Sequence, residues 1–272
     1  MIRNGFICNW MEVQTDGQGR GLFYKYSAYS APAVIFISGL GDGCDSWTGV
    51  QESIAQHAST LAYDRAGTGN SPGVPGPRSC QDLVDELYRL LSLLGIKAPY
   101  ILVGHSFGGL VARLFACCYP DRTAGLVLID AAGEYKELTY ERALPPQHVA
   151  ANRAYLLNPS LNRERIDKMQ SYKQISAARA SMPGNLPLSV ITRGLADEAA
   201  SDWPAQAILE IEQKNQAEFL ELSAASRQVI AGSSGHYVHH DEPGLVIDEI
   251  IGMVQAHSNQ LLNTALRKRL EQ

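Results

Sequence analysis

Residues 101–110 read ILVGHSFGGL and combine three local signals in ten positions. The apolar run before Gly104 is typical of a buried strand, and the apolar spacing after Gly108 is typical of a helix. Between them lies the pattern G-x-S-x-G, with Ser106 at its centre. A serine held between a strand and a helix by two glycines predicts a sharp turn that exposes the hydroxyl.

The chemistry of such a turn explains the two glycines. To raise the hydroxyl of Ser106 above the sheet edge, the backbone must bend through a strained conformation, and side chains at positions 104 and 108 would collide. The N-terminus of the following helix then favours a negatively charged oxygen nearby. The sequence therefore predicts that Ser106 is a nucleophile. The simpler alternative is a glycine-rich turn with a surface serine.

A serine nucleophile needs a base and an acid that orients the base. We expect His236 to be the base, since it follows the last predicted strand and so lies at the same edge as Ser106. His105 is expected to pack beside the turn. For the acid we favour Asp197, which follows strand 186–194 in the pattern G-x-x-D, and we keep Asp130, at the end of strand 124–130, as the alternative.

The oxyanion of an acyl-transfer reaction requires backbone N–H donors. The loop at residues 37–43 reads ISGLGDG, and its three glycines allow close approach of the backbone to a ligand. We expect the N–H groups of Leu40 and Phe107 to form this hole. The alternative is a loop that is only flexible.

Strand-like and helix-like segments alternate along the chain, which predicts an α/β protein with a mostly parallel sheet of about eight strands. Residues 79–95 form a predicted crossover helix, and the turn-rich residues 15–21 predict an edge hairpin. The candidate parallel strands are residues 32–39, 59–65, 100–106, 124–130, 186–194 and 227–233.

The alternation stops at residues 133–187, where helical segments are interrupted by prolines. A structureless loop of that length is improbable in a compact domain. We therefore expect a small helical cap inserted after the sixth strand, with residues 1–132 and 188–272 forming the core.

Composition narrows the classes of partner. The chain has 23 Lys and Arg against 28 Asp and Glu, a net charge of −5, which does not favour nucleic acid or an anionic membrane. The first residues lack an apolar export signal, and no stretch is apolar enough to span a membrane. The five cysteines form no CxxC pair, which is typical of free thiols. These features predict a cytoplasmic location and a small-molecule partner; they leave the oligomeric state open.

With these residues in place, the chain resembles α/β-hydrolases with a small cap over nearly its whole length. The matching segments are GHSFGG, SGLGDG followed by Trp47, YDRAGTGNS, the G-x-x-D ending at Asp197, and Gly235-His236. One departure is Ser38, where many members have histidine. The resemblance implies a serine esterase that cleaves a carboxylic ester through an acyl-enzyme, with no cofactor and no metal.

Other functions stay open at this point. The same triad could open lactones, cleave thioesters or C–C bonds, or perform perhydrolysis, and the fold could serve as a ligand receptor. A metallohydrolase would use His236 and His240 in HYVHHDEP, although Tyr237 stands where a glutamate is needed. His239 and His240 are otherwise expected to face solvent or to cap the next helix.

The substrate is the least determined feature. Several side chains of residues 133–187 are candidates for an apolar acyl pocket or for the insertion's own core: Tyr135, Tyr140, Tyr155, Leu156, Leu157, Met169 and Tyr172. From Glu134 to Pro183 there are eight Lys and Arg against five Asp and Glu. This excess either attracts anionic substrates or reflects solvated helix faces.

Overall fold

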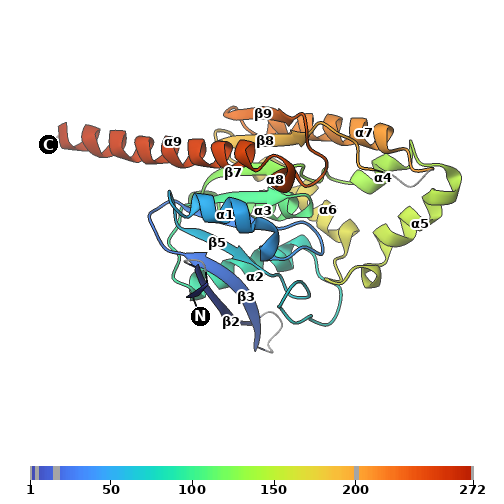
Figure 1. The fold of residues 1–272 in the computed structure, drawn as a ribbon, viewed down its shortest axis with the longest axis horizontal. Coiled ribbons are helices and arrows are strands. Elements are labelled where there is room, and N and C mark those ends of the chain that lie inside the picture. Colours follow the sequence, from blue (N-terminus) through green and yellow to red (C-terminus); the bar gives the residue numbers. More distant parts are fainter. Residues whose placement is uncertain (1, 4–5, 15–18, 199–201, 271–272) are drawn as a thin grey trace.

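The protein is described by a computed structural model, in which residues 2–3, 6–14, 19–198 and 202–270 are placed (Figure 1). Within these ranges, nine strands form one sheet in the order β1-β2-β3-β5-β4-β6-β7-β8-β9. Their bounds are β1 Ile2–Arg3, β2 Phe6–Gln14, β3 Gly19–Ser27, β4 Ala33–Ile37, β5 Thr60–Tyr63, β6 Tyr100–His105, β7 Thr123–Ile129, β8 Leu188–Arg193 and β9 Ser226–Ala231.

The predicted mostly parallel α/β sheet is confirmed. Strands β4 to β9 pair in parallel, and β1, β2 and β3 add an antiparallel edge. The expected edge hairpin is formed by β2 and β3, whose register places Gln14 opposite Gly19. Residues 15–18 of its predicted turn lie outside the described residues. The two-residue β1 raises the strand number from the expected eight to nine.

Helices cover both faces of the sheet, because successive residues of each buried strand point to opposite faces. Val34 and Phe36 pack with α1 and α9, whereas Ile35 and Ile37 pack with α2 and α3. The helices are α1 Thr48–Ile54, α2 Cys80–Leu93, α3 Phe107–Cys118, α4 Lys136–Tyr140, α5 Pro146–Leu157, α6 Lys168–Ala178, α7 Ala205–Ala217, α8 Val238–Asp241 and α9 Pro243–Leu270.

The predicted crossover helix is α2, and it begins where the sequence indicates. Ser79 is its N-cap, and the backbone N–H of Ser79 donates to the carboxylate of Asp82 at 2.7 Å. This reciprocal capping satisfies N–H groups that the first helical turn leaves without a partner. Helix α9 extends past the sheet (Figure 1). None of the helices in the described ranges is long and apolar enough to cross a membrane.

Helices α4, α5 and α6 lie between β7 and β8, where the helical insertion is expected. We refer to residues 133–187 as the insertion. It follows the seventh strand of the structure, not the sixth as expected, because the two-residue β1 adds one strand at the start. Helix α6 packs on α2 and α3, and Tyr172 and Ile175 join the core on that face of the sheet. The boundaries of a separate cap domain remain a prediction.

The parallel strands bring several loops to one edge of the sheet. Ile37 pairs with Gly104, His105 with Ile129, and Ile129 with Ile191, so β4, β6, β7 and β8 end at neighbouring positions. Ligands of open parallel sheets bind outside the carboxyl ends of the strands. The predicted site residues that follow these strands therefore converge at this edge.

Candidate active site

Ser106 occupies a strained turn between β6 and α3. Its φ is 51° and its ψ is −120°, a conformation that few residues with a side chain adopt. The turn is held by backbone bonds: the Ser106 N–H donates to the Ile129 carbonyl at 3.1 Å, and the Ala132 N–H donates to the Ser106 carbonyl at 3.0 Å. The sharp turn predicted from G-x-S-x-G is present.

The two glycines of the turn are required by close backbone approach. A Cβ at Gly104 would lie 2.7 Å from the carbonyl oxygen of Gly108, and a Cβ at Gly108 would lie 2.1 Å from the carbonyl oxygen of Ile37. Real Cβ atoms essentially never come so close to backbone oxygens. The clash expected between positions 104 and 108 is therefore real, and β4 adds a second constraint.

The imidazole of His236 is bound by Asp130. Its Nδ1 lies 2.5 Å from Asp130 Oδ2, and the carboxylate of Asp130 has no exposed surface. The second carboxylate oxygen accepts a bond from the Gln216 amide at 2.8 Å. A carboxylate at Nδ1 fixes the tautomer and leaves Nε2 free to take a proton.

The expectation that Asp197 contacts the His236 ring is wrong. Asp197 Oδ1 accepts from the His236 backbone N–H at 3.3 Å, not from the ring, and its Oδ2 lies 2.5 Å from Arg193 Nη1. The side chain of Asp197 is 51% exposed. Asp130 reaches the ring because it directly follows the last residue of β7, whereas Asp197 lies four residues beyond Arg193, the last residue of β8.

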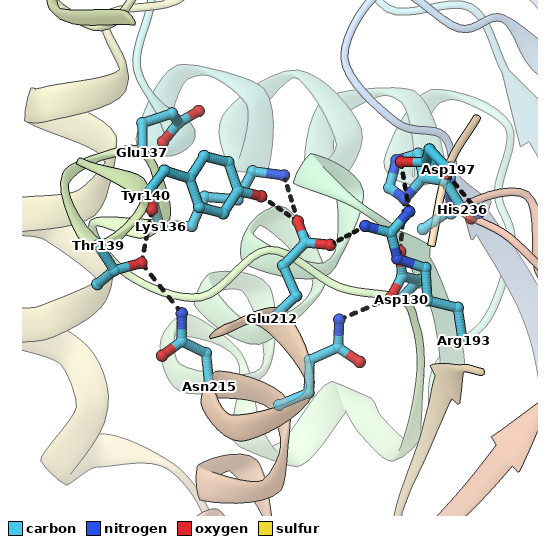
Figure 2. Close-up of polar contacts among 12 residues, drawn as sticks. Asp130, Lys136, Glu137, Thr139, Tyr140, Arg193, Asp197, Glu212, Asn215 and His236 are labelled. Carbon is cyan, nitrogen blue, oxygen red and sulfur yellow. Dashed lines mark hydrogen bonds and ion pairs between the residues drawn. The ribbon is translucent and has the colours of Figure 1, made fainter. Parts of the chain in front are cut away.

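Arg193 lies among the carboxylates of Asp130, Asp197 and Glu212 (Figure 2). Its guanidinium contacts Asp197 and Glu212, and its Nε lies 3.5 Å from Asp130 Oδ2. Burial alone would lower the pKa of Arg193, but Asp130 and Glu212 raise it above its ordinary value. Lys136 extends the network, since its Nζ lies 3.3 Å from Glu212 Oε1. The carboxylate at His236, Asp130, thus belongs to a connected group of charges, most of them buried.

His105 supports the loop that carries His236. Burial, with smaller contributions from His236 and His239, lowers its pKa well below the ordinary value, so the ring is neutral. His105 Nε2 lies 2.9 Å from the His236 carbonyl oxygen, which can only accept, so we assign the proton to Nε2. His105 is therefore packed beside the turn, as expected, and also fixes the His236 backbone.

The loop after β4 is held by Arg65 and by Glu164 of the insertion. Arg65 donates to the carbonyl oxygens of Ser38 and Gly39 at 2.7 and 2.6 Å, and its Nε lies 2.7 Å from Glu164 Oε2. Glu164 Oε1 accepts from the Gly41 N–H at 2.8 Å. The loop that carries Leu40 is therefore more than a flexible segment. Sequence reasoning missed Glu164, which lies 99 residues from Arg65.

Ser38, the departure from the family pattern, keeps the start of the loop hydrogen bonded. Its hydroxyl donates to the Gly43 carbonyl at 3.0 Å and accepts from the indole N–H of Trp47 at 2.9 Å. These two bonds tie the loop to the buried Trp47 ring.

A cavity of about 300 Å³ brings the site residues together. Ser106 and His236 line it, with Leu40 and Phe107 beside them. Asp130 lies behind the His236 ring and does not line the cavity. The insertion contributes Lys136, Glu137, Tyr140, Asn152, Tyr155, Lys168 and Tyr172, and we refer to these seven residues as the insertion wall.

The apolar pocket considered from the sequence is not what the insertion forms. Tyr140, Tyr155 and Tyr172 do line the cavity, but Leu156 lies in the core and Leu157 is 64% exposed. Every residue of the insertion wall carries a polar group.

The histidines of HYVHHDEP have separate partners. His239 stacks on Trp47 with ring centroids 4.4 Å apart, and burial is the main cause that lowers its pKa to about 3. Its expected solvent-facing position is wrong. His240 Nε2 lies 2.8 Å from the Ser46 carbonyl oxygen. In the described ranges, no three His, Cys, Asp or Glu side chains are grouped as metal ligands, so the metallohydrolase alternative has no ligand set there.

Comparison with known proteins shows the family to which the chain belongs. Residues 32–244 match the family described as the alpha/beta hydrolase fold. The chain is 29% identical to the uncharacterized protein YqjL of Bacillus subtilis over 242 residues, which is 87% of this chain and 89% of that protein. It is 30% identical over 167 residues to RutD of Cronobacter turicensis, a protein whose name proposes a carbamate hydrolase, covering 57% of this chain and 62% of that one.

A solved esterase from Thermogutta terrifontis has the same fold, with a TM-score of 0.61 at 19% identity, covering 92% of this chain and 99% of that one. The chain belongs to the α/β hydrolase fold family. Membership of this family supports hydrolase activity for the chain.

Proposed function

We propose that the protein is a serine hydrolase that cleaves a carboxylic ester, or a related acyl bond, of a small molecule through an acyl-enzyme intermediate. Ser106 is the nucleophile, His236 the general base and acid, and Asp130 the carboxylate that orients His236. This assignment replaces Asp197 by Asp130 in the triad expected from the sequence.

The observation that carries the proposal is the 2.5 Å contact between His236 Nδ1 and the fully buried Asp130, on a histidine that shares one cavity with the strained Ser106. Asp130 accepts a hydrogen bond from the Nδ1–H group of His236. The lone pair on Nε2 is therefore available for the serine proton. A serine hydroxyl without such a base is a poor nucleophile. The three groups together have the chemistry of acyl transfer.

In the first half-reaction, Ser106 Oγ forms a bond to the carbonyl carbon while His236 Nε2 takes the hydroxyl proton. The tetrahedral intermediate collapses, and the leaving alcohol receives that proton from the imidazolium. In the second half-reaction, water gives a proton to His236 and attacks the acyl carbon, Ser106 Oγ leaves with that proton, and the acid is released. Asp130 remains a carboxylate throughout and stabilises the imidazolium.

The oxyanion of both intermediates needs donors near the carbonyl. We assign this role to the backbone N–H groups of Leu40 and Phe107, whose residues line the cavity beside Ser106. Phe107 is the first residue of α3, and N–H groups of a first helical turn have no acceptor within the helix. Arg65 and Glu164 hold the loop that presents Leu40.

The test is a panel of chromogenic esters, with thioester, lactone and carbamate arms, assayed with the wild type, Ser106→Ala and Ser92→Ala. Ser92 is an exposed serine at the end of α2 and serves as the matched control. We expect one arm to be hydrolysed, with kcat falling by about 10⁴–10⁶ in Ser106→Ala and unchanged in Ser92→Ala.

Activity of Ser106→Ala within tenfold of the wild type would overturn the assignment of the nucleophile. Binding without hydrolysis of any arm would favour a non-catalytic receptor. The arm that is preferred decides between the ester and the related acyl bonds. The absence of a cofactor, the small-molecule partner and the cytoplasmic location remain predictions.

A further inference from the structure

The insertion wall differs in chemistry from the rest of the cavity. Its seven residues comprise two amines, one carboxylate, one amide and three phenols. The apolar lining comes from other parts of the chain, namely Leu40, Phe107, Ala132 and Trp203. A long aliphatic chain laid against this wall would remove water from polar groups and give them no new partner.

Each oxygen of the wall's carboxylate already accepts a hydrogen bond. Glu137 Oε1 accepts from Lys168 Nζ at 2.6 Å, and Glu137 Oε2 accepts from the Tyr172 hydroxyl. Burial alone would raise the pKa of Glu137, but Lys168 and Lys136 lower it below its ordinary value, so this group is ionised at neutral pH. Glu137 therefore has little capacity to accept a hydrogen bond from a ligand.

The carboxylate behind the wall is bonded in the same way. Glu212 Oε1 lies 3.3 Å from Lys136 Nζ and accepts from the Tyr140 hydroxyl, and Glu212 Oε2 contacts Arg193 (Figure 2). The amide N–H of Asn152 donates to the Glu137 carbonyl at 2.8 Å. The carboxylate oxygens of Glu137 and Glu212 thus all accept bonds from within the protein.

The ammonium groups of Lys136 and Lys168 have more N–H donors than the carboxylates beside them engage. Each carries three N–H donors and no acceptor. Lys168 donates to Glu137 and lies 3.7 Å from the centroid of the Tyr155 ring, while Lys136 is engaged by Glu212 and Tyr140. The side chain of Lys136 is 18% exposed, against 4% for Lys168, and both line the cavity. Tyr140 and Glu212 outweigh the effect of burial and raise the pKa of Lys136, which stays charged.

From this surplus of donors we propose that the substrate of the hydrolase carries a carboxylate, bound by Lys136 with Lys168 beside it while Ser106 attacks the ester carbonyl. This inference rests on the proposed function. The carboxylate belongs either to the acyl part or to the alcohol part of the ester. The other lining carboxylate, Asp42, lies on the loop after β4 with Leu40 and is not part of the insertion wall.

Matched ester pairs test the proposal. The acyl arm compares 4-nitrophenyl hydrogen glutarate with 4-nitrophenyl valerate, which have acyl chains of similar length and differ in the terminal carboxylate. The alcohol arm compares 4-carboxyphenyl valerate with phenyl valerate. We expect kcat/KM to be at least tenfold higher for the carboxylate member of one arm, and that arm identifies the part of the substrate that carries the charge.

Lys136→Met is the variant of choice, because Glu212 keeps its contacts with Arg193 and Tyr140. We expect it to lower kcat/KM for the preferred carboxylate ester at least tenfold more than for its neutral partner, mainly through KM. Lys173→Met, an exposed lysine on α6, is the matched control and should change neither. Higher salt should reduce the preference in the wild type.

Two results would overturn the carboxylate assignment while neutral esters are still hydrolysed by Ser106. One is an equal kcat/KM for the carboxylate and neutral esters of both pairs. The other is an equal loss of kcat/KM for the carboxylate and neutral esters in Lys136→Met. Failure of the proposed function has a different signature: no ester of either pair is hydrolysed, or hydrolysis persists in Ser106→Ala.

Discussion

The two sides of the cavity are built on different principles. On the sheet side, backbone geometry positions the groups: Ser106 is fixed by the close backbone approach at Gly104 and Gly108 and by backbone hydrogen bonds with Ile129 and Ala132. On the insertion side, charged and polar side chains are positioned by one another, as in the bonding of Glu137 by Lys168 and Tyr172. The first side suits a fixed chemical step, and the second suits selection of a substrate.

The two sides are linked at Glu164. This residue of the insertion binds Arg65 and the Gly41 N–H, and Arg65 holds the carbonyl oxygens of Ser38 and Gly39. The pair is almost fully buried, with side-chain exposures of 1% for Arg65 and 0% for Glu164. The position of the proposed oxyanion loop therefore depends on the insertion as well as on the sheet.

After the loss of Ser106 itself, the largest expected effect lies on the sheet side and separates the two aspartates. Asp130→Asn should lower kcat by about 10³–10⁴ with little change in KM, because the carboxylate orients His236 and stabilises the imidazolium only as it forms. Asp197→Asn should lower kcat by less than about tenfold, since Asp197 bonds the backbone of His236 and Arg193 rather than the His236 ring. Steady-state kinetics on both variants, with circular dichroism as a folding control, is the measurement. The reverse ranking would restore Asp197 as the acid.

Part of this site could be predicted from local sequence. The turn around Ser106 was foreseen because its strand, glycines and helix are contiguous, and His236 because it follows the last strand. The aspartate beside the His236 ring is harder to predict, because an aspartate follows each of two neighbouring strands and the choice depends on the loop after β8. There, Arg193 binds Asp197 four residues on and keeps it from the ring. The direct succession of Ile129 by Asp130 was the better signal, since it matches how Ser106 follows β6.

The insertion wall could not be predicted in the same way. Helical segments and an excess of basic residues were visible in residues 133–187, but the partners of the lysines were not. Glu212 lies 76 residues from Lys136 along the chain, and Lys168 is 31 residues from Glu137. Which charges pair, and which donors stay free to face a ligand, depends on tertiary packing that periodicity does not encode.

A second prediction tests the link between the two sides. Glu164→Gln should lower the free energy of unfolding by about 3–5 kcal/mol, because it removes the carboxylate that is ion-paired with the buried Arg65 guanidinium. Urea denaturation measures this. Glu210→Gln, an exposed glutamate on α7, should change stability by less than about 0.5 kcal/mol. A Glu164→Gln protein as stable as the control would show that the pair does not hold the loop.

The smallest expected effect concerns the insertion wall in acid. The pKa of Glu137 lies below its ordinary value of 4.5 in the folded protein, because Lys168 and Lys136 outweigh burial. The unfolded chain therefore takes up this proton at higher pH than the folded protein. The stabilisation is fully present above about pH 4.5 and is lost as the pH falls through the lower, folded value.

The double variant Glu137→Gln/Lys168→Met should accordingly lose less stability than the wild type between pH 5 and pH 3. At pH 7 its free energy of unfolding should differ by less than about 2 kcal/mol, because both members of the buried pair are removed together. Thermal unfolding across this pH range measures both quantities. An unchanged acid dependence would assign the acid sensitivity to other carboxylates.

Covalent labelling with a serine-directed fluorophosphonate, read by intact mass and by peptide mapping, tests most directly whether Ser106 is the nucleophile. We expect one adduct per chain on the folded wild type, located on Ser106, and none on Ser106→Ala. Asp130→Asn should label far more slowly than Asp197→Asn, because only Asp130 orients the base that activates the hydroxyl. An adduct on another residue, or an unlabelled wild type that still hydrolyses esters, would contradict the assignment of Ser106.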